Sequence, residues 1–282
     1  MFKQIIKITR FHNLILGSFA VLVSGYLLEV PFSFSTIYCM SIVMIVMSLA
    51  YIMNDYIDIE SDQINHTYRP LVQNKIKIKS VIVMISILLC LLFILFFKIN
   101  FLALKFLLLF VLPFTFIYNI YFKNIPIVGN LITSVLLSSI FTFSELVLIS
   151  TFHILSLPFF LCFVFNFLRE MIKDMHDYSG DLHVNSKTAP IYFGKRMMNK
   201  FIIVYTVLLM AVCLLPYFIL QLDNIFLVLL IILIEIPLLY SVFLLIKFPN
   251  KKTYKYLSDL LKYLCLGGLL ILMLTKNSNI YV

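Results

Sequence analysis

Long apolar runs alternate with short polar stretches along the whole chain. Each run is close to the roughly 20 residues that a helix needs to cross the hydrocarbon core of a bilayer. Only Lys98 to Asn100 separates the third run from the fourth, and Asp259 and Lys262 interrupt the start of the ninth, so a count of eight stays open. The pattern predicts an all-α polytopic membrane bundle of about nine transmembrane helices, near residues 14–30, 36–58, 80–97, 101–119, 127–147, 152–175, 200–219, 223–246 and 257–275.

The lysines and arginines are distributed unequally between the two sides that nine helices would define. Of the 22, only Lys98, Lys105 and Lys276 lie on one side, and the other 19 lie at the N-terminus and in the connections after the even-numbered helices. Such an excess is typical of the cytoplasmic loops of membrane proteins. We therefore expect a multi-pass protein of the cell membrane, with its N-terminus and even-numbered connections in the cytoplasm.

The composition supports the same class of protein. The 282 residues are 62% hydrophobic and 12% charged, with a mean hydropathy of +1.06. Soluble globular domains carry about 25% charged residues, so a water-soluble domain is excluded. The net charge of +9 is carried by residues that flank apolar runs. This placement fits contact with membrane lipids, and we expect no nucleic-acid partner.

A first cluster of acids follows the second apolar run, in the sequence NDYIDIESDQINHTYRP from Asn54 to Pro70. A helix advances about 100° per residue, so Asn54, Asp58 and Asp62 form one polar stripe along a helix face. Glu60 points away from this stripe and is expected to be exposed. The cluster holds four of the 13 acids: Asp55, Asp58, Glu60 and Asp62.

A second cluster follows the sixth run, in the sequence REMIKDMHDYSGD. If the helix continues through Gly180, Asp174, Asp177 and Asp181 share one face; a helix end at Gly180 is the alternative. Glu170 is expected to be exposed, as Glu60 is. Asn54 and Asp177 lie 123 residues apart at equivalent helix ends. One membrane-embedded domain over residues 1–282, with a four-helix pseudo-repeat, would explain this spacing.

Two facing clusters of carboxylates at a membrane surface would repel each other and would be costly to desolvate. Divalent cations remove this difficulty, and carboxylate pairs that share a cation with phosphate oxygens are typical of Mg²⁺ sites. The spacing therefore predicts a magnesium-bound diphosphate between the clusters. Four basic residues near the same membrane level could neutralise the remaining phosphate oxygens, or could serve only as membrane anchors: Arg69, Lys123, Arg169 and Lys173.

These residues resemble the motifs of the UbiA superfamily of intramembrane prenyltransferases. Its members carry N-x-x-x-D-x-x-x-D after the second helix and D-x-x-x-D after the sixth. The stretch YNIYFKNIPIVGN, with Lys123, Pro126 and Gly129, is similar to the family's connection between helices four and five. The resemblance implies Mg²⁺ as cofactor, a prenyl diphosphate as donor, and metal ligands and catalytic acids at matching positions: Asn54, Asp58, Asp62, Asp177 and Asp181.

Within the superfamily the chain looks most like the geranylgeranylglycerol-phosphate geranylgeranyltransferases. That likeness implies transfer of a geranylgeranyl group to geranylgeranylglyceryl phosphate in ether-lipid synthesis, with Asp55 or Asp174 accepting the hydroxyl proton. After Arg69 and Pro70 the chain continues with Leu-Val-Gln-Asn, where chlorophyll synthases and homogentisate prenyltransferases usually have Ile-Pro-Ser-Gly. An aromatic acceptor, as in quinone synthesis, is the alternative.

Other polar residues have two interpretations each. Asn13 could reach the site from the first helix. Glu235, near the middle of the eighth run, could line a substrate cavity or make a helix contact, and it is the feature that an ion-coupled transporter would require. His66, His176 and His183 neighbour the motifs without a cysteine at metal-ligand spacing, and we expect them to be loop residues. The sequence gives no indication of the oligomeric state.

Overall fold

The structure, a computed structural model, describes residues 2–275. Every regular element among them is helical, which confirms the all-α prediction. The short elements are α1 (Phe2–Ile8), α4 (Ile59–Asn65), η2 (Phe122–Asn124) and α10 (Ala189–Phe193). The long ones are α2 (Phe11–Leu27), α3 (Phe34–Ile57), α5 (Ile78–Phe96), α6–η1–α7 (Phe101–Phe106, Leu107–Val111 and Leu112–Ile120), α8 (Val128–Ile149), α9 (Ser156–His183), α11 (Lys195–Ile219), α12–η3–α13 (Asn224–Leu230, Ile231–Glu235 and Ile236–Lys247) and α14 (Lys251–Leu274).

Seven helices of the described chain are long and apolar enough to cross a membrane: α3, α5, the α6–α7 rod, α8, α11, the α12–α13 rod and α14. The two other expected spans coincide with α2, which has 17 residues, and with α9, whose last half carries the second acidic cluster. A multi-pass membrane protein is therefore supported, and the count of nine stays a prediction. Lys276, used in the charge tally, lies outside the described residues.

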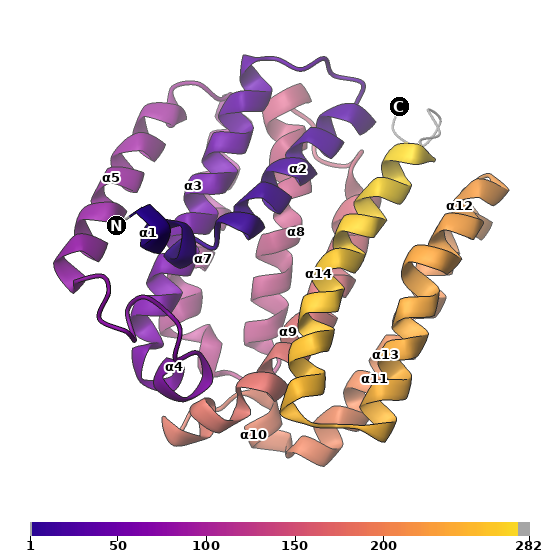
Figure 1. Ribbon diagram of the computed structural model, residues 1–282. Helices are drawn as coiled ribbons and strands as arrows, with labels where there is room; N and C mark the ends of the chain where they lie inside the picture. Colours follow the sequence, from indigo (N-terminus) through magenta and orange to yellow (C-terminus); the bar gives the residue numbers. More distant parts are fainter. Residues whose placement is uncertain (1, 276–282) are drawn as a thin grey trace.

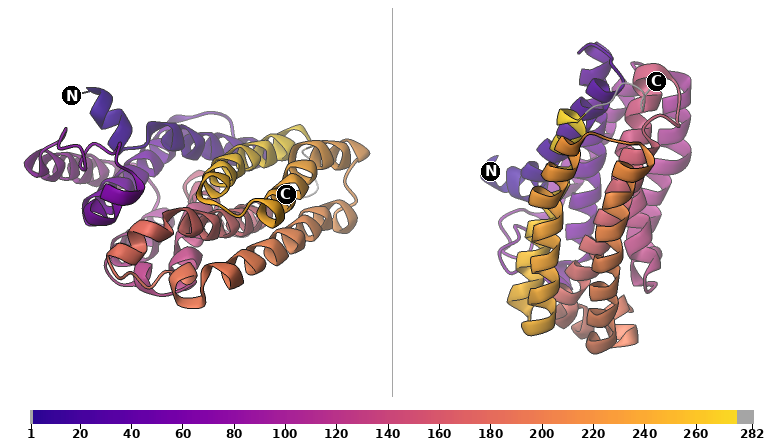
Figure 2. Two further views of the ribbon diagram at one scale, coloured as in Figure 1. Left: turned by 60° about the horizontal axis from the view of Figure 1, so that its bottom comes forward. Right: turned by 90° about the vertical axis from the view of Figure 1, so that its right-hand side faces the viewer.

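The long helices stand side by side, and α4 and α10 lie at the same end of the bundle (Figure 1). The last helix, α14, packs against α2, α9 and the α12–α13 rod, so it joins the first half of the chain to the second (Figure 2). The two largest of four clusters of buried side chains in residues 2–275 lie in the two halves of the bundle. One is shared by α9, α11, α12–α13 and α14, and the other by α2, α3, α5, the α6–α7 rod and α8.

Helices α8 and α9 pack along each other between these two clusters. Small side chains on α8 permit this approach, and Ser134 and Ser138 are fully buried there. Their hydroxyls donate to the carbonyl oxygens of Asn130 and Ser134, 2.6 and 2.7 Å away, so no buried hydroxyl donor is left unpaired at these two positions. The close pairing fixes α9, which carries the acids of the second cluster, against the centre of the bundle.

Glu145, which the sequence analysis did not single out, organises the connection between α8 and α9. Its buried carboxylate accepts hydrogen bonds from the backbone N–H groups of Ile154 and Leu155, at 3.0 and 2.8 Å, and from the Thr151 hydroxyl at 2.7 Å. These N–H groups precede α9, where helical partners are lacking. A carboxylate at a helix N-terminus is also favoured by the helix dipole.

Two π turns interrupt long helices at corresponding places. Both η1 and η3 precede a helix with proline at its second position, Pro113 in α7 and Pro237 in α13, 124 residues apart. This offset is close to the 123 residues that separate the acidic motifs, which supports the four-helix pseudo-repeat. Glu235 ends the second turn, where it is 8% exposed and its Oε1 has no hydrogen-bond partner among residues 2–275. This burial is compatible with both expected interpretations of Glu235, a cavity-lining acid and a helix contact.

Candidate active site

The first acidic motif lies where α3 passes into α4. Asp58 separates the two helices, yet the spacing of four is kept, because the Asp58 N–H donates to the Asn54 carbonyl and the Asp62 N–H to the Asp58 carbonyl, at 2.9 and 2.8 Å. The predicted stripe of Asn54, Asp58 and Asp62 therefore survives the break and lines one cavity. Glu60 is exposed, as expected.

The second motif lies on an unbroken helix. Helix α9 continues through Gly180 to His183, so the alternative of a helix end at Gly180 is wrong. Glycine is required there for another reason. A Cβ at this position would lie 2.5 Å from the Ser61 carbonyl oxygen of α4. Gly180 thus allows the backbones of α4 and α9 to approach closely, which brings the two motifs together.

Asn65, at the end of α4, holds the two motifs in register. Its side-chain amide donates to the backbone carbonyl of Asp177 at 2.6 Å, and its carbonyl oxygen accepts from the Gly180 N–H and the Ser179 hydroxyl, both at 3.1 Å. The sequence analysis missed this residue. Asn65 follows Asp62 by three positions and so continues the same helix face, which is the signal that could have found it.

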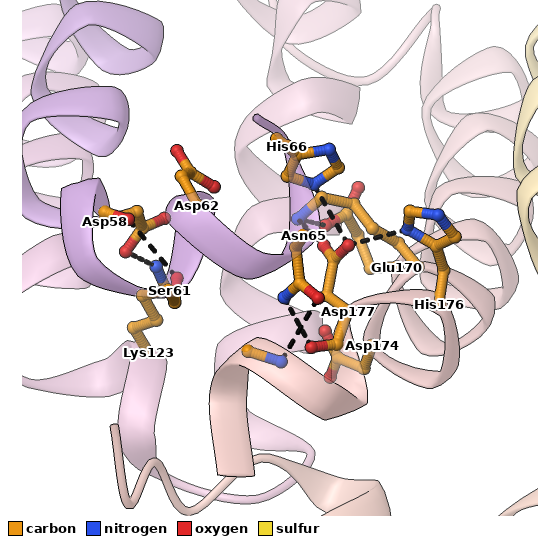
Figure 3. Close-up of polar contacts among 12 residues, drawn as sticks. Asp58, Ser61, Asp62, Asn65, His66, Lys123, Glu170, Asp174, His176 and Asp177 are labelled. Atoms are coloured by element: carbon orange, nitrogen blue, oxygen red, sulfur yellow. Dashed lines mark hydrogen bonds and ion pairs between the residues drawn. The ribbon is translucent and has the colours of Figure 1, made fainter. Parts of the chain in front are cut away.

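A single acidic cavity receives side chains from both motifs. Figure 3 shows Asp58 and Asp62 on one side of it and Asp174 and Asp177 on the other. Tyr118, Asn130 and Thr188 also line it, and none of them was expected. The structure brings into this cavity nine of the predicted site residues: Asn54, Asp58, Asp62, Arg69, Lys123, Lys173, Asp174, Asp177 and Asp181.

Basic side chains neutralise most of these acids. Lys123 pairs with Asp58 and Arg69 with Asp62, and the Lys173 ammonium lies 3.7 Å from Asp177. Burial nevertheless raises the pKa of Asp62 to about 7, against the opposing effect of Arg69. Burial makes the charged form of this carboxyl group costly, so a further cation nearby would stabilise that form.

Asp55 and Asp174 differ in their suitability as proton acceptors. Asp55 is 3% exposed and is held by two guanidinium groups, with Arg10 at 2.6 Å and Arg69 at 3.1 Å. Both guanidinium groups contact its Oδ1, and Asp55 does not line the acidic cavity. Asp174 lines the acidic cavity and accepts one hydrogen bond, from the Asn130 amide at 2.8 Å. The structure therefore favours Asp174 of the two.

Three predicted residues, Asn13, Asp55 and Arg169, lie outside the acidic cavity. Arg169 pairs with Glu170 at 2.7 Å, and Asn13 donates to the Tyr51 hydroxyl at 3.2 Å. Both line a separate basic cavity, and the contact of Arg169 with phosphate oxygens stays a prediction. Glu170 is 6% exposed, so its expected exposure was wrong, because Arg169 holds it inside the bundle.

The sequence analysis placed all three histidines in loops, which is wrong for two of them. His176 lies within α9, and His183 is the exposed last residue of that helix. His66 does follow α4 in a loop, but it is not remote from the site. Its Nε2 lies 3.0 Å from Asp177 Oδ1, and His176 Nδ1 lies 2.7 Å from the same oxygen. Burial lowers the pKa of His66, against the opposing effect of Asp177.

Two apolar cavities extend into the bundle from this end. The first, about 170 Å³, is lined by α2, α9 and α14 among others, with Phe165 and Leu264 in its wall. The second, about 160 Å³, is lined by α3, the α6–α7 rod and α8, with Val111 and Leu136 in its wall. The basic cavity, about 380 Å³, opens beside both. Asn13 and Arg169 line all three.

Comparison with known proteins gives a consistent result. The model of the UbiA prenyltransferase family matches residues 16–266. The chain is 31% identical to the digeranylgeranylglyceryl phosphate synthase of Methanocaldococcus jannaschii, over 92% of this chain and 91% of that protein. It is 32% identical to the enzyme of the same name from Methanococcus aeolicus, over 76% of each chain.

Solved structures share the fold. A structure from work on digeranylgeranylglyceryl phosphate synthase in membranes matches with a TM-score of 0.71 at 28% identity, covering 98% of each chain. A UbiA homologue from Archaeoglobus fulgidus, bound to GPP and Mg²⁺, matches with a TM-score of 0.65 at 13% identity, covering 95% of this chain and 99% of that one. The helical architecture expected from the motifs is confirmed.

Proposed function

Because this chain belongs to the UbiA prenyltransferase family, we propose that it transfers a geranylgeranyl group from its diphosphate to geranylgeranylglyceryl phosphate, a step of ether-lipid synthesis. The relatives that carry the name digeranylgeranylglyceryl phosphate synthase support this acceptor. The observation that carries the proposal is structural. Two cavities of opposite charge lie side by side, and each shares lining residues with an apolar cavity: the acidic one with the second, and the basic one with both.

The acidic cavity suits the donor. It shares Asn54, Tyr118 and Lys173 with the second apolar cavity, so a diphosphate among the aspartates would have its prenyl chain between α3 and α8. Lys123, Arg69 and Lys173 are placed to hold the diphosphate oxygens, because each already contacts an acid at the cavity wall.

The basic cavity suits a lipid phosphate as acceptor. Its acids are only Asp55 and Asp259, against seven lysines and arginines. It shares Arg169, Lys262 and Asn13 with the first apolar cavity, so a phosphate bound there would have its chain between α2, α9 and α14. A monoanionic or dianionic phosphate is the ligand that such a surface favours. The seven basic residues are Lys7, Arg10, Arg69, Arg169, Lys173, Lys255 and Lys262.

The donor set of the acidic cavity fits Mg²⁺. Its oxygen ligands are carboxylates and one amide, which hard divalent cations prefer. The side chains of Asn54 and Asp181 have no hydrogen-bond partner among residues 2–275, so their oxygens are available. Asp58, Asp62 and Asp177 would complete the set. Bound Mg²⁺ would stabilise the negative charge that develops on the diphosphate as its bond to carbon breaks.

The reaction breaks the bond between the allylic carbon of the donor and its diphosphate oxygen, and forms a bond from that carbon to the acceptor's hydroxyl oxygen. Asp174 is the group placed to take the hydroxyl proton, since Asn130 holds its carboxylate in the acidic cavity. The apolar walls near Val111 and Phe143 exclude water, which would otherwise compete with the acceptor. We also infer that this end of the bundle faces the cytoplasm, because the basic connections gather there.

Acceptor chemistry provides the test. The purified protein would be given labelled geranylgeranyl diphosphate with geranylgeranylglyceryl phosphate, its dephosphorylated alcohol, or 4-hydroxybenzoate. We expect product from the first, and a rate reduced at least about tenfold for the alcohol, because the phosphate contacts are lost. Product from 4-hydroxybenzoate alone would refute the lipid acceptor and favour the aromatic alternative.

Variants of the two cavities separate donor from acceptor. Lys262→Met removes one charge from the basic cavity and should raise KM for the lipid phosphate about tenfold, with KM for the donor unchanged. Lys123→Met should instead raise KM for the donor and lower kcat. Equal effects of the two variants on both substrates would contradict the assignment of the cavities.

A further inference from the structure

His66, His176 and Asp177 form a group whose geometry the proposed reaction does not explain. One ligand atom from each lies within 4.8 Å of the other two. The side chains come from the loop after α4 and from α9, so the group forms only when the two motifs meet. Figure 3 shows both imidazole rings directed toward the Asp177 carboxylate, at the side of the acidic cavity away from Lys123.

The contacts are unusual for a simple hydrogen-bonded cluster. Both His66 Nε2 and His176 Nδ1 lie close to the same oxygen, Asp177 Oδ1, at 3.0 and 2.7 Å. Within residues 2–275, the buried His66 Nε2 makes no hydrogen bond, although it lies at ion-pair distance from Asp177. A buried nitrogen without a hydrogen bond is costly, and a metal ion bound by all three atoms would satisfy it.

We propose that His66, His176 and Asp177 form a binding site for a divalent transition metal ion of the Zn²⁺ type, distinct in chemistry from the magnesium site. Imidazole nitrogens favour zinc over magnesium, and two imidazoles with one carboxylate are a common zinc ligand set. Tetrahedral zinc places its ligand atoms about 3.4 Å apart, so the two imidazole nitrogens would move away from Asp177 Oδ1 by about 0.4 and 0.7 Å to bind it. A water molecule or a phosphate oxygen would be the fourth ligand.

The neighbouring groups support this assignment. Tyr68 Oη lies 3.4 Å from His66 Nδ1, the other ring nitrogen, so it can accept the N–H that leaves Nε2 free to bind metal. The nearest cation, Lys173, lies 3.7 Å from Asp177 Oδ2 and leaves Oδ1 for the metal. His66 and His176 both line the basic cavity, which provides a route for the ion.

Asp177 is common to this site and to the proposed magnesium set. Zinc bound here would therefore compete with Mg²⁺ for Asp177 and inhibit prenyl transfer. That consequence rests on the proposed function, whereas the binding of zinc does not. Binding can be measured without substrate, so a failure of the proposed reaction would leave the result on zinc interpretable.

The test is equilibrium binding of Zn²⁺ to the purified full chain without Mg²⁺, repeated with added Mg²⁺, which should compete through Asp177. His66→Gln and His176→Asn keep an N–H group near Asp177 but remove the imidazole. Each should weaken zinc binding on the order of 100-fold, and Tyr68→Phe about tenfold. His183→Asn, on the same helix but exposed, is the matched control and should bind as the wild type does.

X-ray absorption at the zinc edge gives a second measurement. The wild type should show two imidazole ligands, and the double variant of His66 and His176 should show none. Melting temperatures without metal would show whether each variant is folded. Zinc affinity that is equal in the wild type and in both folded single variants, or a spectrum without imidazole, would overturn the proposal.

Discussion

Substitution of Gly180 by alanine probes the contact that brings the two acidic motifs together. The added Cβ would lie 2.5 Å from the Ser61 carbonyl oxygen, about 0.9 Å short of the 3.4 Å at which ordinary contact begins. The neighbour is a backbone atom, so it cannot rotate away. Overpacking of this kind typically costs about 1–3 kcal/mol of stability. The strain falls on the packing of α4 against α9.

If the added methyl group pushes α4 away from α9, the effect on activity should be larger than the effect on stability. Helix α4 carries Asp62 and Asn65, and α9 carries Asp177, so separation of the two helices by about 1 Å moves the motifs apart. A misplacement of that size can reduce catalysis about 100-fold. We expect Gly180→Ala to lower kcat/KM for the prenyl diphosphate by about two orders of magnitude, measured with the labelled donor, and to lower the melting temperature.

Gly267→Ala on α14 is the matched control. Its Cβ would meet Ile234 and Leu233 at 3.7 Å or more, which is ordinary contact, and alanine is the better helix former by about 1 kcal/mol. This variant should keep the wild-type activity and stability. If Gly180→Ala also kept both, the close approach of α4 and α9 would not be needed for the site, and the reasoning above would be refuted.

Three further predictions follow from individual contacts. Asp58→Asn and Asp177→Asn should each reduce kcat at least about 100-fold while the circular dichroism spectrum stays helical, because the oxygen ligands for Mg²⁺ lose charge; activity within a few-fold of wild type in both would rule out the two-motif site. Glu145→Gln should lower the free energy of unfolding by about 1–3 kcal/mol with kcat unchanged, since charged hydrogen bonds to the α9 N-terminus are weakened; unaltered stability would contradict this capping role. Asn65→Ala should raise KM for the donor and lower kcat, because α4 is no longer tied to α9; kinetics that change only for the acceptor would argue against it.

Helical periodicity explains why the shared face of the acids could be predicted from the sequence. The spacing of four in Asn54, Asp58 and Asp62, and again in Asp177 and Asp181, specifies a shared helix face whatever the tertiary structure. Apolar runs likewise predicted the long helices, because a span must bury its backbone hydrogen bonds. These features depend on local sequence alone.

Contacts between helices were less predictable. Glu170 was misjudged because its position depends on how deeply α9 sits against α8 and α14, which spacing does not specify. His66 and Asn65 reach Asp177 only because Gly180 lets α4 approach α9. No pattern within one segment shows that a residue of α4 lies beside a residue more than 100 positions later.

The most direct measurement of the central claim uses the purified protein with radiolabelled geranylgeranyl diphosphate and geranylgeranylglyceryl phosphate, with Mg²⁺ and after removal of Mg²⁺ by chelation. The account predicts a doubly prenylated lipid phosphate on thin-layer chromatography, formed with Mg²⁺, lost on chelation and restored when Mg²⁺ is added back. Formation of that lipid at an equal rate without divalent cations, or no lipid product while label passes to an aromatic acid, would contradict it.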